Sequence, residues 1–175
     1  MLKENHLDEI EPKWFAIYTK PRTEKKVFEQ LEQFGYETYL PLKKEVRQWK
    51  DRLKKVEVPL FNSYVFVKVN AKQYYEIPKL VQGFVKFVTI GGQKIAVREE
   101  EIEIIKKMLD FSSEIDVSNE DFRLNDKVEI KTGKLTGLKG KLVELRGKFR
   151  IAIRVDSLGT NLLVEINKNS VSKIL

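Results

Sequence analysis

The chain has 175 residues, of which 42% are hydrophobic and 34% are charged, and its formal net charge is +7. This length allows one domain or two small ones. The chain has no cysteine and a single histidine, His6, which excludes disulfides and thiolate metal sites and leaves almost no material for histidine-dependent catalysis. No apolar run approaches the roughly 20 residues that span a membrane, and the first twelve residues are too acidic for a signal peptide. We therefore expect a cytoplasmic protein that is not an enzyme and needs no metal or cofactor.

The charges divide the chain into three segments. Residues 1–111 carry 21 Lys and Arg against 17 Asp and Glu, residues 112–121 carry none against 4, and residues 122–175 carry 12 against 5. The acidic middle segment lacks helical periodicity and is rich in Ser, Asp and Glu, so we interpret it as a flexible linker. The predicted organisation is a first domain at 12–111, a linker at 112–121 and a second domain at 122–175.

The first domain alternates strand and helix patterns. Trp14–Thr19 is predicted as a strand, and Pro21 with Thr23 then opens a helix that Gly35 ends with a left-handed cap. Further along, we expect strands at Glu37–Leu40, Glu45–Trp49, Pro59–Val69 and Gly83–Ile90, and helices at Ala71–Ile77 and Arg98–Phe111. Elements that return in this way to one antiparallel sheet predict an α+β domain.

The segment 43–55 is strongly basic, with seven Lys and Arg against two carboxylates, and Trp49 and Leu53 are interleaved among the charges. This pattern predicts a basic hairpin or loop that projects from the sheet. Two interpretations stay open at this point: a contact with nucleic acid, or a charged loop that is merely solvated.

The strand at Pro59–Val69 has two apolar faces of different character. Alternation places Val65 and Val67 on one face and Tyr64 and Phe66 on the other. The valines suit a core, whereas the aromatic face needs a cover. That cover is either a helix of the same chain or a partner.

The second domain lacks a helical stretch of useful length. Its short strands are expected at Lys127–Lys131, Lys139–Leu145, Phe149–Val155, Asn161–Ile166 and Val171–Ile174, separated by glycine-containing turns. Five short strands within residues 122–175 predict a small all-β barrel.

Several motifs occur in an order and spacing that resemble a known family. They are Trp14–Thr19, Pro59–Val67 and Val81–Val88 before Gly91 and Gly92, followed by Leu124–Ile130 and Gly133–Val143. Residues 14–110 resemble the N-terminal domain of NusG-type transcription elongation factors, and residues 124–152 resemble a KOW motif. The implied fold is an α+β NusG N-terminal-like domain followed by an SH3-like KOW barrel.

The chain resembles most the specialised RfaH-like and UpxY-like antiterminators. The general factor usually has proline and glycine where this chain has Asn62 and Ser63, and its KOW loop usually carries aromatic residues where this chain has Leu135 and Leu138. The second difference puts in doubt a contact with the ribosome through that loop.

The resemblance implies a factor that binds the clamp helices of the largest subunit of bacterial RNA polymerase and suppresses pausing and termination. The implied polymerase-binding residues are Phe61, Tyr64, Phe66, Phe87, Trp14 and Tyr18. The resemblance places Lys20, Arg22 and Lys25 near the non-template DNA strand. To these the charge pattern adds Lys43, Lys44, Arg47, Lys50 and Arg52 as a basic arm.

An alternative interpretation is an RNA-binding or ribosome-associated KOW protein. In that case the basic barrel supplies the main affinity, and the first domain is an accessory. Binding of RNA polymerase by the first domain would distinguish the two.

Overall fold

The computed structural model describes residues 11–112, 114–121, 125–145 and 147–174, so His6 lies outside the described residues. The chain divides into two compact units. The first comprises the residues up to Pro41 together with Phe61–Ile102, and the second comprises Leu42–Leu60 together with the residues from Glu103 onward. Within the described part of the chain, no helix combines the length and the apolar character that crossing a membrane requires.

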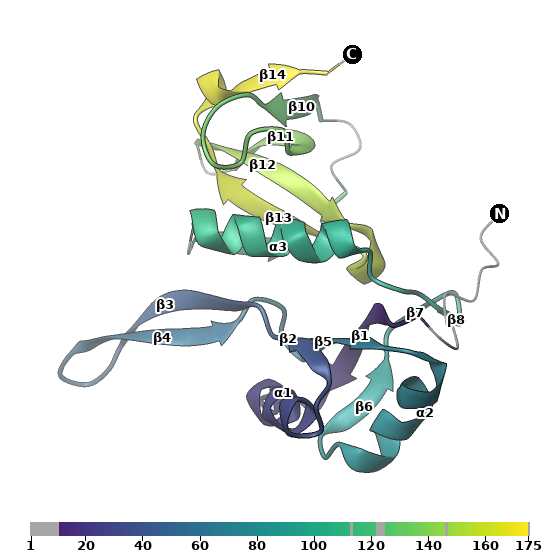
Figure 1. The fold of residues 1–175 in the computed structure, drawn as a ribbon. Coiled ribbons are helices and arrows are strands. Elements are labelled where there is room, and N and C mark those ends of the chain that lie inside the picture. The colour runs from purple at the N-terminus through teal and green to yellow at the C-terminus, as the bar shows by residue number, and fades with distance from the viewer. Residues whose placement is uncertain (1–10, 113, 122–124, 146, 175) are drawn as a thin grey trace. The chain divides into compact units, whose positions relative to one another are not determined.

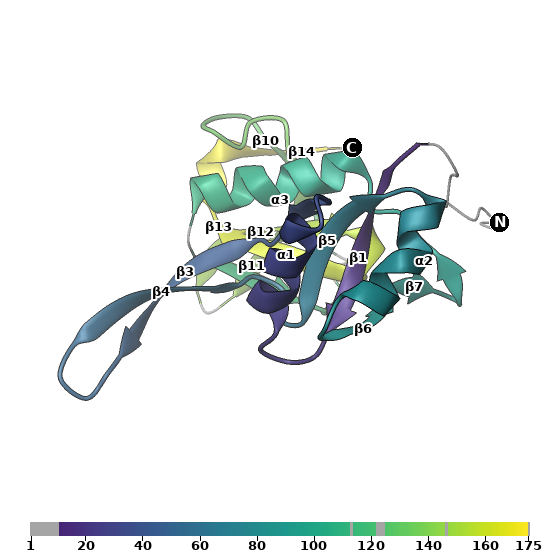
Figure 2. The same cartoon turned by 60° about the horizontal axis from the view of Figure 1, so that its bottom comes forward.

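The first unit contains a four-stranded antiparallel sheet in the order β2-β5-β1-β6 (Figure 1). Its strands are β1 (Lys13–Thr19), β2 (Glu37–Tyr39), β5 (Tyr64–Val69) and β6 (Phe84–Phe87). Two helices, α1 (Glu24–Gln33) and α2 (Ala71–Leu80), cover the same face of this sheet, as Figure 2 shows. The α+β architecture predicted from the alternating patterns is therefore present.

Local sequence signals explain where these helices begin and end. Asn70 accepts a hydrogen bond from the backbone of Gln73 at 3.1 Å, and the Gln73 side chain accepts one from the backbone of Asn70 at 3.0 Å, which forms a capping box at the start of α2. Gly35 follows α1 with φ +81°, the left-handed conformation that glycine adopts most easily. The cap predicted at Gly35 is thus confirmed.

The face under the helices is the hydrophobic core of the first unit. Strand register pairs Phe15 with Val67 and Ile17 with Val65, and all four side chains are buried. The ring of Tyr74 from α2 packs against Phe15, with 5.0 Å between ring centroids. The valine face predicted from the sequence therefore packs against the helices of its own unit.

The predicted strand Gly83–Ile90 is two strands. The first is β6, and the second, β7 (Thr89–Ile90), pairs with β8 (Gln93–Lys94) across a turn at Gly91 and Gly92, which both have positive φ. The last helix, α3 (Glu99–Phe111), starts with three glutamates, which complement its positive N-terminal end.

The basic segment forms the hairpin predicted for it. Strands β3 (Leu42–Gln48) and β4 (Leu53–Pro59) pair along their whole length and make a two-stranded ribbon (Figure 1). The backbone N–H of Trp49 donates to the carbonyl of Arg52 at 2.8 Å and closes the turn. Exposure increases toward that turn, where both strands lie open to solvent.

The second unit contains a six-stranded antiparallel sheet, called here the barrel sheet, in the order β14-β10-β11-β12-β13-β9. Its strands are β9 (Ile115–Ser118), β10 (Lys127–Ile130), β11 (Lys139–Leu145), β12 (Lys148–Val155), β13 (Thr160–Glu165) and β14 (Val171–Lys173). Gly140 lies so close to β12 that a Cβ at this position would come within 2.5 Å of the Ala152 carbonyl oxygen. Only glycine, which has no Cβ, fits at this close approach between β11 and β12.

The flexible coil expected at 112–121 is wrong in its middle. Residues 115–118 form β9, which pairs with β13 so that Ile115 lies opposite Val164 and Val117 opposite Leu162. Ile115 is fully buried. The burial of Ile115 and the backbone hydrogen bonds between β9 and β13 stabilise a strand here, although the polar composition of the segment favours a coil. The domain boundaries at 12–111, 112–121 and 122–175 stay a prediction.

Candidate functional site

The face of the first sheet that is turned away from the helices carries its aromatic side chains in rows. Register pairs Tyr18 of β1 with Tyr64 of β5 on one side and with Lys86 of β6 on the other. We call these three side chains the tyrosine row. Both tyrosines are partly exposed and Lys86 is exposed, so the row presents two aromatic rings flanked by a cation.

The two tyrosine rings support each other. Their centroids lie 5.4 Å apart in an edge-to-face arrangement, which fixes the orientation of both rings. Burial, and to a smaller extent the neighbouring Tyr18, raise the pKa of Tyr64 above its ordinary value. The Tyr64 hydroxyl is therefore protonated at neutral pH and offers a neutral hydrogen-bonding group on an aromatic surface.

The next row of the same face is buried. Phe66 has no exposed surface and packs against the ring of Phe61 at 6.1 Å and the ring of Tyr39 at 6.2 Å between centroids. Trp14 is also buried, and the Lys68 ammonium lies 5.8 Å from its ring centroid. Three of the six residues predicted to bind a polymerase, Phe61, Phe66 and Trp14, are therefore buried in this structure.

Phe87 is on the other face of the sheet. It pairs with Ile17, which itself pairs with Val65, so Phe87 shares the helix-covered face. Its ring stacks on Tyr74 of α2 with 3.7 Å between centroids. The expected place of Phe87 on the docking surface is wrong, because the strand register directs its side chain into the core.

A basic turn follows β1 directly. Lys20, Arg22 and Lys25 are all exposed in or next to this turn. The backbone N–H of Lys20 donates to the carbonyl of Gly83 at 2.9 Å, and that of Thr23 donates to the carbonyl of Lys20 at 3.2 Å. The structure thus places the three predicted cations in this turn and the first turn of α1, and it bonds the backbone of Lys20 to Gly83, the residue before β6.

Arg22 has a backbone conformation that is unfavourable for its residue type. Its φ is +64°, in the left-handed region that glycine or asparagine usually occupies at this position of a turn after proline. A strained residue of this kind is retained where its side chain is needed, which makes Arg22 a functional candidate.

A second turn, which contains Ser63, lies at the same end of the sheet and is fixed by hydrogen bonds to Thr19 and Glu24. Ser63 has φ +65°, its carbonyl accepts from the N–H of Thr19 at 2.8 Å, and its N–H donates to the buried carboxylate of Glu24 at 2.7 Å. Glu24 begins α1, so this helix positions the loop that leads into Tyr64. Sequence reasoning missed Glu24, because an acidic residue in a first turn is usually explained by the helix dipole alone.

The second group of predicted cations belongs to the hairpin and hence to the other unit. Lys43 lies near its base, partly buried, and donates to the carbonyl of Ile115 at 3.4 Å. Lys44, Arg47, Lys50 and Arg52 are exposed. Burial opposes ionisation of Glu45, but the hydrogen bonds from Arg47 and Lys43 and the charges of these two residues together hold the pKa of this carboxyl below its ordinary value.

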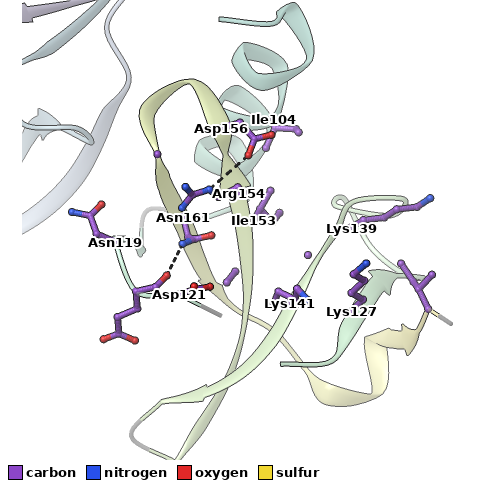
Figure 3. Close-up of a pocket in the computed structure, with 15 residues that line it drawn as sticks. Ile104, Asn119, Asp121, Lys127, Lys139, Lys141, Ile153, Arg154, Asp156 and Asn161 are labelled. Carbon is purple, nitrogen blue, oxygen red and sulfur yellow. Dashed lines mark hydrogen bonds and ion pairs between the residues drawn. The ribbon is translucent and has the colours of Figure 1, made fainter. Parts of the chain in front are cut away.

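The second unit also contains a pocket of about 900 Å³ (Figure 3). Lys127, Lys139 and Lys141 lie on one side of it, and on the other side the amide of Asn161 donates to the carbonyl of Glu120 at 3.0 Å. Lys127 and Lys141 are direct cross-strand partners. Among the residues that the structure describes, no group of three or more His, Cys, Asp or Glu side chains could hold a metal ion.

Two functional candidates were absent from the sequence prediction: Lys86, and Lys54, whose ammonium lies 5.1 Å from the ring centroid of the exposed Trp49 in the hairpin. Lys86 could have been found from the sequence, because alternation within Phe84–Phe87 places the side chains of Lys86 and Phe87 on opposite faces of the strand. Lys54 could not have been found from the sequence, because only the register of the hairpin shows that its side chain lies on the same face of the ribbon as Trp49.

Comparisons with known proteins agree with this architecture. Residues 12–106 match the family described as "Transcription termination factor nusG". The chain is 26% identical over 164 residues to the transcription termination/antitermination protein NusG of Chlamydia trachomatis, and to that of Chlamydia muridarum, an alignment that covers 87% of this chain and 90% of each relative. A solved structure of Thermotoga maritima NusG covers 95% of this chain and 99% of its own, with 21% identity and a TM-score of 0.55, and has the same fold.

The family match covers more than half of the chain and includes the whole sheet that carries the tyrosine row and the basic turn. Proteins of this family are non-enzymatic transcription factors that bind RNA polymerase. This chain therefore belongs to the NusG family of transcription termination and antitermination factors.

Proposed function

We propose that this protein is a specialised elongation and antitermination factor that docks on the clamp helices of RNA polymerase through the tyrosine row and contacts the non-template DNA strand through the basic turn. One observation carries the proposal: Tyr18 and the basic turn are consecutive along the chain, so an aromatic surface and an anion-binding segment adjoin at one end of one sheet. A helix pair laid on such a surface buries aromatic rings, while nearby cations neutralise phosphates.

The docking surface of this proposal is smaller than the sequence predicted. Tyr18, Tyr64 and Lys86 make the contact, whereas Phe61, Phe66 and Trp14 are buried. The edge-to-face contact between the two tyrosines matters for affinity, since a ring that is already held in place loses little conformational freedom on binding.

The specialised role rests on two departures from the general pattern. Ser63 takes a left-handed conformation where the general factor usually has glycine. Leu135, in the loop where that factor usually carries aromatic residues, is buried, so its side chain is not presented to a partner such as the ribosome.

A pull-down with purified RNA polymerase tests the docking surface. Tyr64→Ala should weaken binding about tenfold, equivalent to about 1.4 kcal/mol, because a half-buried ring is removed from the docking surface. Tyr75→Ala is the matched control, because Tyr75 is an exposed tyrosine on α2, which covers the opposite face of the sheet. Equal binding by Tyr64→Ala and the natural protein would rule out the tyrosine row.

The DNA contact has its own test. Replacing Lys20, Arg22 and Lys25 with alanine should lower the salt dependence of binding to an elongation complex by roughly one log–log unit for each phosphate that the protein no longer neutralises. Lys72 and Lys79, exposed on α2, provide a control with the same chemistry. A salt dependence equal to that of the control would remove the basic turn from the DNA contact.

A second candidate function is RNA binding by the barrel sheet. It is favoured by the direct cross-strand pairing of Lys127 with Lys141, since like charges in this arrangement repel and a bound phosphate would relieve that repulsion. Replacing both with glutamine should weaken RNA binding by the full chain and leave polymerase docking unchanged, as measured by fluorescence anisotropy and pull-down.

A further inference from the structure

The turn end of the β3–β4 hairpin has two faces of different composition. Register pairs Arg47 with Lys54 and Gln48 with Leu53, so alternation places Arg47, Trp49 and Lys54 on one face. We call these three residues the stacking face. Val46, Leu53 and Lys55 lie on the other face, called here the reverse face.

Trp49 is half exposed, with 51% of its surface open to solvent. The Lys54 ammonium lies 5.1 Å from the centroid of its ring, which confirms that the two side chains share a face. A two-stranded ribbon has no core of its own to which this ring could contribute. The hairpin therefore holds a large aromatic side chain at its far end, with a cation directly beside it.

The charge around the ring indicates which partner fits. Between residues 46 and 54 there are four basic residues, Arg47, Lys50, Arg52 and Lys54, and one acidic residue, Asp51. A flat exposed ring beside cations matches an unpaired nucleotide, whose base stacks on the ring and whose phosphates meet the cations. A duplex keeps its bases stacked on one another and offers only phosphates.

We propose that the stacking face binds single-stranded nucleic acid, with one base stacked on Trp49 and the adjacent phosphates contacted by Arg47 and Lys54. This inference deepens the proposed function and rests on it, because it assigns to the hairpin the unpaired strand that a transcribing polymerase exposes. It also states which face of the basic hairpin binds the strand, with the base at Trp49 and the phosphates at Arg47 and Lys54.

Glu45 limits the strength of this site. It shares the stacking face, and its carboxylate lies 3.2 Å from the Arg47 guanidinium and 3.3 Å from the Lys43 ammonium. A phosphate must compete with this carboxylate for Arg47. Glu45→Gln should therefore strengthen binding about two- to fivefold, since a neutral amide holds the guanidinium less tightly.

The experiment uses the full chain and fluorescence anisotropy with labelled oligo(dT), oligo(U) and a duplex, each of about twelve nucleotides or base pairs. The natural protein should bind the single strands more tightly than the duplex. Trp49→Ala should weaken single-strand binding roughly tenfold, Trp49→Phe should restore most of it, and duplex binding should change little. The stronger of the two single strands identifies DNA or RNA as the source.

The reverse face supplies matched controls. Leu53→Ala removes an exposed apolar side chain, and Lys55→Gln removes a cation adjacent in sequence to Lys54. Both should bind single strands within about twofold of the natural protein, whereas Lys54→Gln should lower the log–log salt slope by about 0.7, the value for one phosphate of a single strand. Equal reductions in affinity for Leu53→Ala and Trp49→Ala, or unchanged affinity for Trp49→Ala, would overturn the inference.

Polymerase pull-down separates this inference from the proposed function. The Trp49→Ala protein should dock on polymerase as the natural protein does. If Trp49→Ala docks normally and binds single strands as tightly as the natural protein, the stacking site is wrong and the proposed function is unaffected. If Tyr64→Ala docks normally, the docking surface of the proposed function is wrong.

Discussion

The sheet of the first unit and the hairpin of the second both combine aromatic rings with basic side chains, but they hold them differently. In the sheet, Tyr18 and Tyr64 lie edge to face, on the same face as the fully buried ring of Phe66. In the hairpin, Trp49 is exposed and its ring lies beside the long, flexible side chain of Lys54. Similar composition thus holds two rings against each other in one place and exposes a single ring in the other, and we propose a docking surface for the first and a strand-binding arm for the second.

Phe66→Ala should produce the largest effect, because it removes a completely buried ring, whereas the aromatic ring of the hairpin is exposed. We expect the free energy of unfolding to fall by about 3–5 kcal/mol, since the ring is completely buried and leaves a cavity. Chemical denaturation measures this change. Tyr64→Ala, on the same strand and face, is the control and should cost clearly less. Comparable changes would mean that the two rows of the face are equally buried.

Gly83→Ala tests how firmly the basic turn is held. A Cβ at Gly83 would lie 2.9 Å from the Thr23 hydroxyl oxygen, and φ is +94°, so we expect stability to fall by about 1–3 kcal/mol. Gly35→Ala has a comparable φ of +81° with no atom within 4 Å of the added Cβ, and it isolates the backbone strain. If thermal denaturation gives the same decrease for both, Gly83 and Thr23 are not tightly packed.

The coupling between Tyr18 and Tyr64 measures how far the tyrosine row acts as a unit. A double-mutant cycle with alanine at both positions should give an interaction free energy of about 0.5–1.5 kcal/mol in folding stability, the usual range for an edge-to-face pair. Tyr64 with Tyr75, which lies on α2, should be additive. A Tyr18–Tyr64 coupling of zero would show that the two rings are positioned independently.

Arg22→Gly should produce the smallest effect on stability, and its sign is informative. Glycine tolerates the φ of +64° without strain, so the free energy of unfolding should rise by up to about 1 kcal/mol or stay unchanged. Binding to an elongation complex should nevertheless weaken. A variant that is less stable and binds DNA normally would show that Arg22 serves the fold.

Strong periodic signals made much of the fold predictable. The alternation of Val65 and Val67 with Tyr64 and Phe66 identified a strand with two apolar faces, and the density of Lys and Arg identified the hairpin. Both are local patterns. The residue types therefore carried enough information to predict each element and to expect that aromatic side chains would be important.

What the sequence could not supply were relations between strands. Phe87 was expected beside Tyr64, but the register with Ile17 places it on the opposite face. Phe66 was expected at the surface, but the rings of Phe61 and Tyr39 pack against it. Alternation divides a strand into two faces without stating which neighbours cover each one, so the sequence did not show that Phe66 and Phe87 are buried.

The pairing of β9 with β13 affects where the chain can be divided. A fragment that starts at residue 122 would lack Ile115–Ser118, and Asn161–Val164 would become an edge with unpaired backbone N–H and C=O groups. That edge carries Leu162, Leu163 and Val164, whose side chains are buried in the full chain. An apolar edge of this kind is a template for pairing with a second molecule. The acidic segment between the two basic regions thus protects the barrel from self-association, and an autonomous barrel must begin before Ile115.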